Sequence, residues 1–89
     1  MIKESAPAPW LPPKYAKADA AAIQALVRGD ATPEQQQRAV NWVVNQAADT
    51  YGFTYRQDSR DHAFAEGRRF VGLQCVKMLK LNLSILKEV

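Results

Sequence analysis

The stretch that decides the fold is DHAFAEGRRFVGLQCVKMLKL, from Asp61 to Leu81. Its apolar residues recur at helical spacing on two faces, with Phe64 and Val71 on one and Phe70 on the other. A helix that is apolar on two faces has to be covered on two sides. We therefore expect one long packing helix over residues 59–87, which begins near Asp58 or Ser59.

Two glycines and three leucines mark the contact points of this expected helix. Gly67 and Gly72 each cost about 1 kcal/mol relative to alanine inside a helix, and a close helix crossing is the simplest compensation. Leu79, Leu83 and Leu86 lie toward the carboxyl end, where two shorter helices cannot cover them. We expect these five residues to form a helix-packing or oligomer surface.

A first, shorter helix is expected over residues 19–28. We expect the helix to start with Asp19 as N-cap, or one residue earlier, and Gly29 is the residue type that ends a helix in the left-handed conformation. The alanines that follow Asp19 favour helix but bury little area, so this helix needs tertiary support.

The clearest helix start in the chain precedes residues 33–51. Thr32 suits the N-cap, Pro33 the first helical position and Gln35 the capping-box position. We expect Gly52 to end this helix and its apolar stripe to be core. The stripe consists of Val40, Val43, Val44, Ala47 and Tyr51.

Trp42 lies off the centre of that stripe. Two interpretations stay open: the indole widens the core, or it sits at an edge that another chain covers.

Residues 1–16 hold all but one of the five prolines. Proline fixes φ and disfavours helix in the preceding residue, so this segment is expected to be an extended, polyproline II-like arm. The arm is either a tail with one aromatic residue folded back on the domain or a docking arm that inserts into a neighbouring subunit. Its candidate partner-binding residues are Trp10, Leu11 and Tyr15.

The expected fold is all-α: a small bundle of about three helices, with a long C-terminal helix and an extended Pro-rich N-terminal arm. Residues 1–16 form the arm and residues 17–89 the helical domain of this 89-residue chain. The extended connector at residues 53–56 has no partner strands for a sheet. Because so small a core is marginal, a homo-oligomer or a bound partner is the default expectation.

The net charge of +3 lies in the second half of the chain, where seven Lys/Arg stand against four Asp/Glu. A basic half permits nucleic-acid binding, although this excess is modest. In one interpretation Arg69 pairs with Glu66 and Arg68 is solvated. In the other, four arginines form a patch that binds phosphate or a partner's carboxylates. The candidate patch residues are Arg56, Arg60, Arg68 and Arg69.

No catalytic, metal or cofactor site is expected. His62 is the only histidine and Cys75 the only cysteine, which leaves neither a nucleophile with its base nor the ligand spacing of a zinc site. We expect Cys75 to be a buried, reduced thiol. The amino terminus has no signal-peptide pattern, and no apolar run is long enough to span a membrane, so a soluble intracellular product is expected. A helix-turn-helix DNA reader at residues 19–51 is weak, because Arg38 is the only basic residue of its second helix.

Two segments carry a resemblance to a known family: Ala31-Thr32-Pro33-Glu34-Gln35-Gln36 followed by Trp42, and the run from Phe64 to Gly72. Over residues 18–81 the chain resembles a family of small uncharacterised tailed-bacteriophage proteins that is named for a small protein of a Bordetella podophage. Genes of this family tend to sit among head and packaging genes.

This resemblance implies a non-enzymatic role in a virion or in the cytoplasm of the bacterial host. The first expectation is a structural or assembly component of the head, portal or packaging machinery, which contacts itself and other phage structural proteins. One alternative is a nucleic-acid-binding packaging factor similar to a small terminase subunit. Another is a host-takeover protein that binds and inhibits a bacterial protein.

Overall fold

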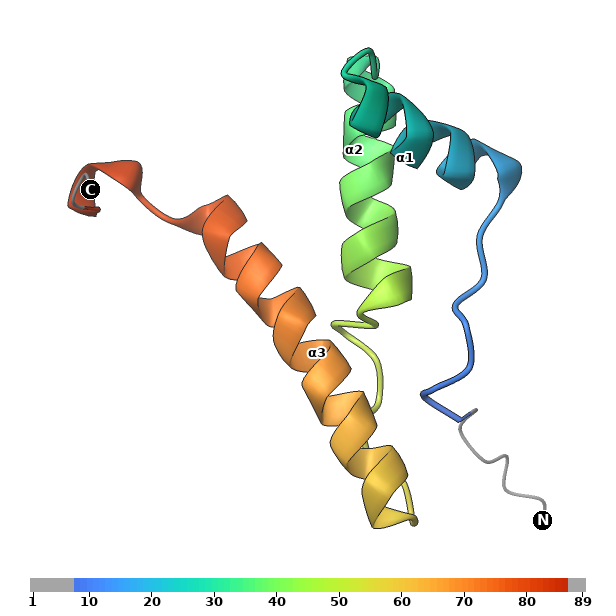
Figure 1. The fold of residues 1–89 in the computed structure, drawn as a ribbon. Coiled ribbons are helices and arrows are strands. Elements are labelled where there is room, and N and C mark those ends of the chain that lie inside the picture. Colours follow the sequence, from blue (N-terminus) through green and yellow to red (C-terminus); the bar gives the residue numbers. More distant parts are fainter. Residues whose placement is uncertain (1–7, 87–89) are drawn as a thin grey trace.

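The structure is a computed structural model that describes residues 8–86. Its elements are α1 (Lys17–Arg28), α2 (Pro33–Asn41), the π-helical turn η1 (Trp42–Ala47), α3 (Ser59–Lys80) and the 3₁₀ turn η2 (Leu83–Ile85). The described residues contain no strand, so the expected all-α fold with three main helices and an extended arm is confirmed. Figure 1 shows α1 crossing the upper end of α2, while the carboxyl-terminal half of α3 points away from α2.

Helix α1 begins two residues before the expected start. Its N-cap is Ala16, and Asp19 lies three residues later, where its carboxylate accepts a hydrogen bond from the Ala16 N–H at 2.8 Å. The expected N-cap role of Asp19 is therefore wrong, since the carboxylate reaches back to the helix start from inside the first turn. Gly29 ends the helix with φ 85°, as expected.

The start of α2 is confirmed at Thr32, whose hydroxyl accepts from the Gln35 N–H at 3.1 Å while the Gln35 side chain accepts from the Thr32 N–H at 3.0 Å. The expected continuous helix over residues 33–51 is wrong. From Trp42 the chain widens into a π turn, in which the Ala48 N–H donates to the Val43 carbonyl at 2.9 Å, and helical structure ends at Ala47.

The connection after η1 turns at Asp49 rather than at Gly52. Asp49 adopts the left-handed conformation with φ 50°, and the Gly52 N–H donates to the Asp49 carbonyl at 3.0 Å. Thr50 then folds back onto η1, donating from its hydroxyl to the Val44 carbonyl at 2.7 Å. The Thr50 N–H donates to the same carbonyl at 3.1 Å, so two donors from Thr50 satisfy the Val44 carbonyl.

Helix α3 begins at Ser59, as expected, and its N-cap is Asp58, whose carboxylate accepts from the N–H groups of Arg60 and Asp61 at 2.8 and 3.2 Å. Its expected end at residue 87 is wrong: α3 ends at Lys80, and residue 87 itself lies outside the described residues. Asn82 caps a new short turn by accepting from the Ser84 N–H at 3.0 Å. This local side-chain bond competes with continuation of the helix.

The buried core is made of small side chains. Its hydrophobic members are five alanines and one valine, and the largest fully buried side chain is that of Thr50. The expected core stripe is only partly correct, because Val44 is buried while Val40 and Tyr51 are exposed by 39% and 69%. Val40 lies in α2, before the π turn, and Tyr51 lies in the turn beyond η1, where it no longer follows the helical stripe. The buried hydrophobic residues are Ala22, Ala25, Ala39, Val44, Ala48 and Ala65.

The chain is more open than a compact monomer of its size. Its accessible surface is 7399 Å² for a mass of 10.0 kDa, whereas size scaling predicts about 5,200 Å². The radius of gyration is 16.0 Å against about 12 Å for a compact 89-residue domain. Figure 1 shows the reason, since α2 and the carboxyl-terminal half of α3 diverge.

Candidate functional site

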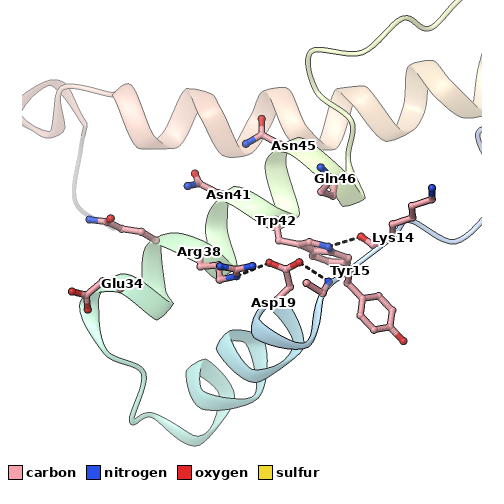
Figure 2. A pocket seen from close by; sticks show the side chains of 11 residues that line it. Lys14, Tyr15, Asp19, Glu34, Arg38, Asn41, Trp42, Asn45 and Gln46 are labelled. Carbon is pink, nitrogen blue, oxygen red and sulfur yellow. Dashed lines mark hydrogen bonds and ion pairs between the residues drawn. The ribbon is translucent and has the colours of Figure 1, made fainter.

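A polar cleft lies between the arm, α1 and the α2–η1 helix (Figure 2). It has a volume of about 760 Å³. Asp19, Arg38 and Trp42 hold its walls together, and uncharged amides cover much of the α2–η1 side. The amide side chains that line it are Gln37, Asn41, Asn45 and Gln46.

An ion pair ties the two helical walls of the cleft. The Arg38 Nε donates to the Asp19 Oδ1 at 2.8 Å, and the Asp19 side chain is 18% exposed. The Ala16 N–H and the Arg38 guanidinium both favour the charged carboxylate, so the pKa of Asp19 is lowered from its ordinary value. The pair therefore stabilises the crossing of α1 and α2.

Trp42 ties the arm to the same cleft. Its indole N–H donates to the Lys14 carbonyl at 2.9 Å, and its side chain is half-buried. Figure 2 shows the indole between the arm and the helix, with Tyr15 pointing away from it. The Trp42 indole thus lies at an edge of α2–η1, and the arm of the same chain covers it.

The cleft presents mainly hydrogen-bonding side chains. Primary amides both donate and accept, so a row of them suits polar main-chain or side-chain groups of another polypeptide. Within residues 8–86, no group of three or more His, Cys, Asp or Glu side chains is placed to hold a metal ion. His62 lies away from the cleft, with its Nδ1 3.1 Å from the Thr54 carbonyl.

Arg68 fixes the end of η1 and the arm at one point. Its Nε and Nη2 donate to the carbonyls of Ala47 and Gln46 at 2.8 and 3.2 Å. Its Nη1 donates to the carbonyl of Pro9, which is buried, at 2.8 Å. One guanidinium therefore satisfies carbonyls at the end of the π turn and holds the arm against them.

Arg69 lies beside Arg68 but serves a different carbonyl. Its Nε donates to the Thr50 carbonyl at 2.9 Å, while Glu66 accepts from the Thr54 hydroxyl. The expected pairing of Arg69 with Glu66 and the expected solvation of Arg68 are both wrong. Sequence spacing missed the arginine contacts because their acceptors are main-chain carbonyls between 19 and 59 residues away.

The other two candidate arginines are Arg56, in the connector before α3, and Arg60, in the first turn of α3. Arg56 donates from Nη1 to the carbonyls of Phe53 and Tyr55 at 2.9 and 3.0 Å, and Arg60 is exposed in the first turn of α3. Hydrogen bonds to carbonyls thus engage three of the four candidate patch residues, and Arg60 is the member whose side chain is open to solvent.

The described part of the arm, residues 8–16, folds back on its own chain. The Trp10 indole N–H donates to the Asp61 Oδ1 at 3.1 Å, and Leu11 turns back on Ala8. The apolar surfaces of the arm are nevertheless open: Trp10 is 58%, Leu11 48% and Tyr15 70% exposed. Main-chain and indole hydrogen bonds anchor the arm and leave its apolar side chains available to a partner.

The two glycines of α3 differ in their surroundings. Gly72 is buried against Ala48 and Thr50, so the close crossing expected there is confirmed. Gly67 is exposed, and an added Cβ would meet nothing within 4 Å, so the close crossing expected there is wrong.

The three candidate leucines lie beyond this crossing. Leu79 is at the end of α3, whereas Leu83 and Leu86 lie in or next to η2 and not on the same helix. They are 65%, 76% and 49% exposed. Leu79 also borders an apolar groove between α3 and α2, which its sequence spacing did not reveal.

Cys75 lines the same groove and is half-buried rather than fully buried. Among the described helices, none has the length and hydropathy that crossing a bilayer requires.

The chain was compared with known proteins at three levels. No protein-family model, no curated protein and no solved structure matches it.

Proposed function

We propose that this protein is a non-enzymatic component of a bacteriophage virion or of its assembly machinery, and that it acts through protein–protein contacts. The observation that carries the proposal is the lack of large side chains in the core. None of the leucine, isoleucine, methionine or aromatic side chains between residues 8 and 86 is buried. A subunit of this kind reaches full burial only when neighbours cover it.

The contact surfaces support the same role. Phe53, in the loop before α3, is 82% exposed, and Phe70 and Met78, on α3, are 61% and 66% exposed. Apolar area spread over several faces fits a subunit with more than one neighbour better than it fits a single ligand pocket. The phage assignment itself rests on the resemblance of residues 18–81 to the small tailed-phage proteins.

The nucleic-acid-binding alternative has weaker support. A phosphate-contacting surface needs guanidinium groups that reach outward. Arg68 and Arg69 donate to main-chain carbonyls instead. Steep loss of DNA affinity with added salt would favour this alternative, and no binding at low salt would exclude it.

The host-takeover alternative shares the exposed apolar surfaces but has no observation of its own in its favour. Capture of a single host protein by the purified chain, in stoichiometric amount, would favour it over the virion role.

The test of the proposal is quantitative mass spectrometry of gradient-purified virions. We expect peptides of this chain at a fixed copy number relative to the major head protein, across the gradient fractions that carry infectivity. A non-structural phage protein of similar abundance in the infected cell serves as the contamination control. Detection only at the level of that control would overturn the virion role, and purified empty precursor particles would then test the assembly role in the same way.

A further inference from the structure

An apolar groove lies in the angle where α2 and α3 diverge. Its walls carry no charged or polar side chain except the thiol of Cys75, and its volume is about 240 Å³. Small-molecule sites usually exceed 300 Å³, so this groove is sized for a few side chains. The residues that matter here are Leu26, Val40 and Val43 on one wall and Cys75, Met78 and Leu79 on the other.

The chain also presents an apolar projection that matches this groove. After α3 ends, Leu83, Ile85 and Leu86 are 76%, 68% and 49% exposed. Asn82 gives this segment a defined shape, because its side chain accepts from both the N–H and the hydroxyl of Ser84, at 3.0 and 2.8 Å. Figure 1 shows the segment at the far end of α3, away from α1 and α2.

The exposed area is sufficient for a stable dimer. The surface of 7399 Å² exceeds the compact-monomer value by about 2,200 Å². A standard interface buries about 800 Å² on each partner, and obligate dimers bury about 1,000–2,500 Å² on each. The excess surface of one copy, to which the extended arm also contributes, is therefore as large as the surface that each copy of an obligate dimer removes from solvent.

We infer that a second copy of this chain fills the groove, so that residues 81–86 of each copy dock between α2 and α3 of the other. This inference deepens the proposed function, on which it rests, by naming one of the neighbours. A two-fold arrangement makes the exchange reciprocal, so both grooves are filled and no groove remains open. The uncharged walls suit the Leu–Ile–Leu segment and offer nothing to a charged ligand.

The first test measures self-association by analytical ultracentrifugation. We expect wild-type protein to be dimeric at micromolar concentration. The tail variant Leu83→Asp/Ile85→Asp and the groove variant Val40→Asp/Met78→Asp should each weaken dimerisation at least about a hundredfold, because two apolar contacts per groove are lost. The matched control is Val27→Asp, at a residue that is 83% exposed and lies outside the groove, and it should stay dimeric.

Mixing the two variants sharpens this test. The tail variant keeps an intact groove and the groove variant keeps an intact tail, so an equimolar mixture should form heterodimers with one intact contact. The tail variant alters only exposed side chains beyond α3, so it stays informative even if the groove variant fails to fold. A monomeric wild type, or a tail variant that dimerises like wild type, overturns the inference.

The second test identifies the occupant by disulfide trapping. Ser84→Cys places a thiol on the exposed tail, and Cys75 is the only native cysteine. Mild oxidation should give a covalent dimer, which should be lost when Cys75→Ser is added. A disulfide within one chain would mean that the tail occupies its own groove, which overturns the inference. A Cys75-independent dimer would do the same.

Failure of this inference and failure of the proposed function can be told apart. If the purified protein is monomeric but is found at fixed copy number in virions, only the reciprocal docking of residues 81–86 is overturned. A dimer that is absent from virions and precursor particles overturns only the assembly role.

Discussion

The buried Gly72 of α3 lies directly against the side chain of Thr50, and these two residues form the crossing between α3 and the end of η1. A Cβ built on Gly72 would collide with the Thr50 Oγ1 and would lie 2.8 Å from the Ala48 Cβ. The Thr50 hydroxyl cannot turn away freely, because it donates to the Val44 carbonyl. Gly72, the Thr50 hydroxyl and the Val44 carbonyl of η1 therefore pack together as one unit.

Gly72→Ala is expected to destabilise the protein by about 1–3 kcal/mol, because overpacking at Thr50 outweighs the gain in helix propensity. Gly67→Ala is the matched control in the same helix. It should raise the free energy of unfolding by about 0.5–1 kcal/mol, since open space surrounds Gly67. Urea unfolding followed by circular dichroism measures both. Equal effects of the two substitutions would contradict the crossing described for Gly72.

Arg68→Met should lower the free energy of unfolding by about 2 kcal/mol, because it removes the charged donor from three carbonyls while keeping an apolar stem. Arg68→Lys should recover only part of this, since a point charge cannot reach all three acceptors. The control, Arg60→Ala, alters an exposed arginine and should change stability by less than about 0.5 kcal/mol. If Arg68→Met leaves the unfolding midpoint unchanged, the arginine is not an anchor of the arm.

Deletion of residues 2–13 should keep the helical circular dichroism but weaken assembly with partners. It removes the Pro9 carbonyl and the Trp10 indole, so Arg68 and Asp61 each lose a partner. Trp10→Phe removes one hydrogen bond and should cost about 1 kcal/mol. Tyr15→Ser, at a 70% exposed residue, is the control for stability. Loss of helix on deletion would mean that the arm is part of the core.

The Asp19 carboxylate should make stability depend on pH. The pKa of Asp19 is lowered in the folded state, chiefly by the Ala16 N–H and further by Arg38. Its contribution is therefore present above the ordinary aspartate pKa of about 3.9 and is lost as pH falls through the lower folded value. Asp19→Asn should be less stable than wild type at pH 7, and the gap should close below about pH 4. A gap in melting temperature that persists at pH 2 would assign the effect to something other than charge.

Local signals in the sequence were sufficient where a few neighbouring residues decide the structure. The Thr32–Gln35 capping box, the left-handed Gly29 and the Asp58 N-cap are each satisfied by atoms within three or four residues. Two side chains that bond to nearby main-chain groups were misread. Asp19 caps from inside its helix, and Asn82 starts a new turn that stops α3 at Lys80.

Helical periodicity could not predict contacts between residues that are far apart in the sequence. The spacing of Glu66 and Arg69 indicates a surface pair, yet Arg69 finds the Thr50 carbonyl, 19 residues away. The arginine patch suggested by composition lies on the connector before α3 and on α3 itself, and main-chain carbonyls engage three of its four members. Helical spacing could not separate Gly67 from Gly72, because only the position of Thr50 distinguishes them.

The sequence by itself determined that the chain is helical, where most of its helices begin, and that an extended arm precedes them, because caps, prolines and apolar spacing act within a turn or two. The tertiary structure decided which apolar faces are left open, because that depends on how α2 and α3 diverge. It also decided that Arg68 holds the arm, because a guanidinium takes whichever carbonyls the fold leaves unsatisfied.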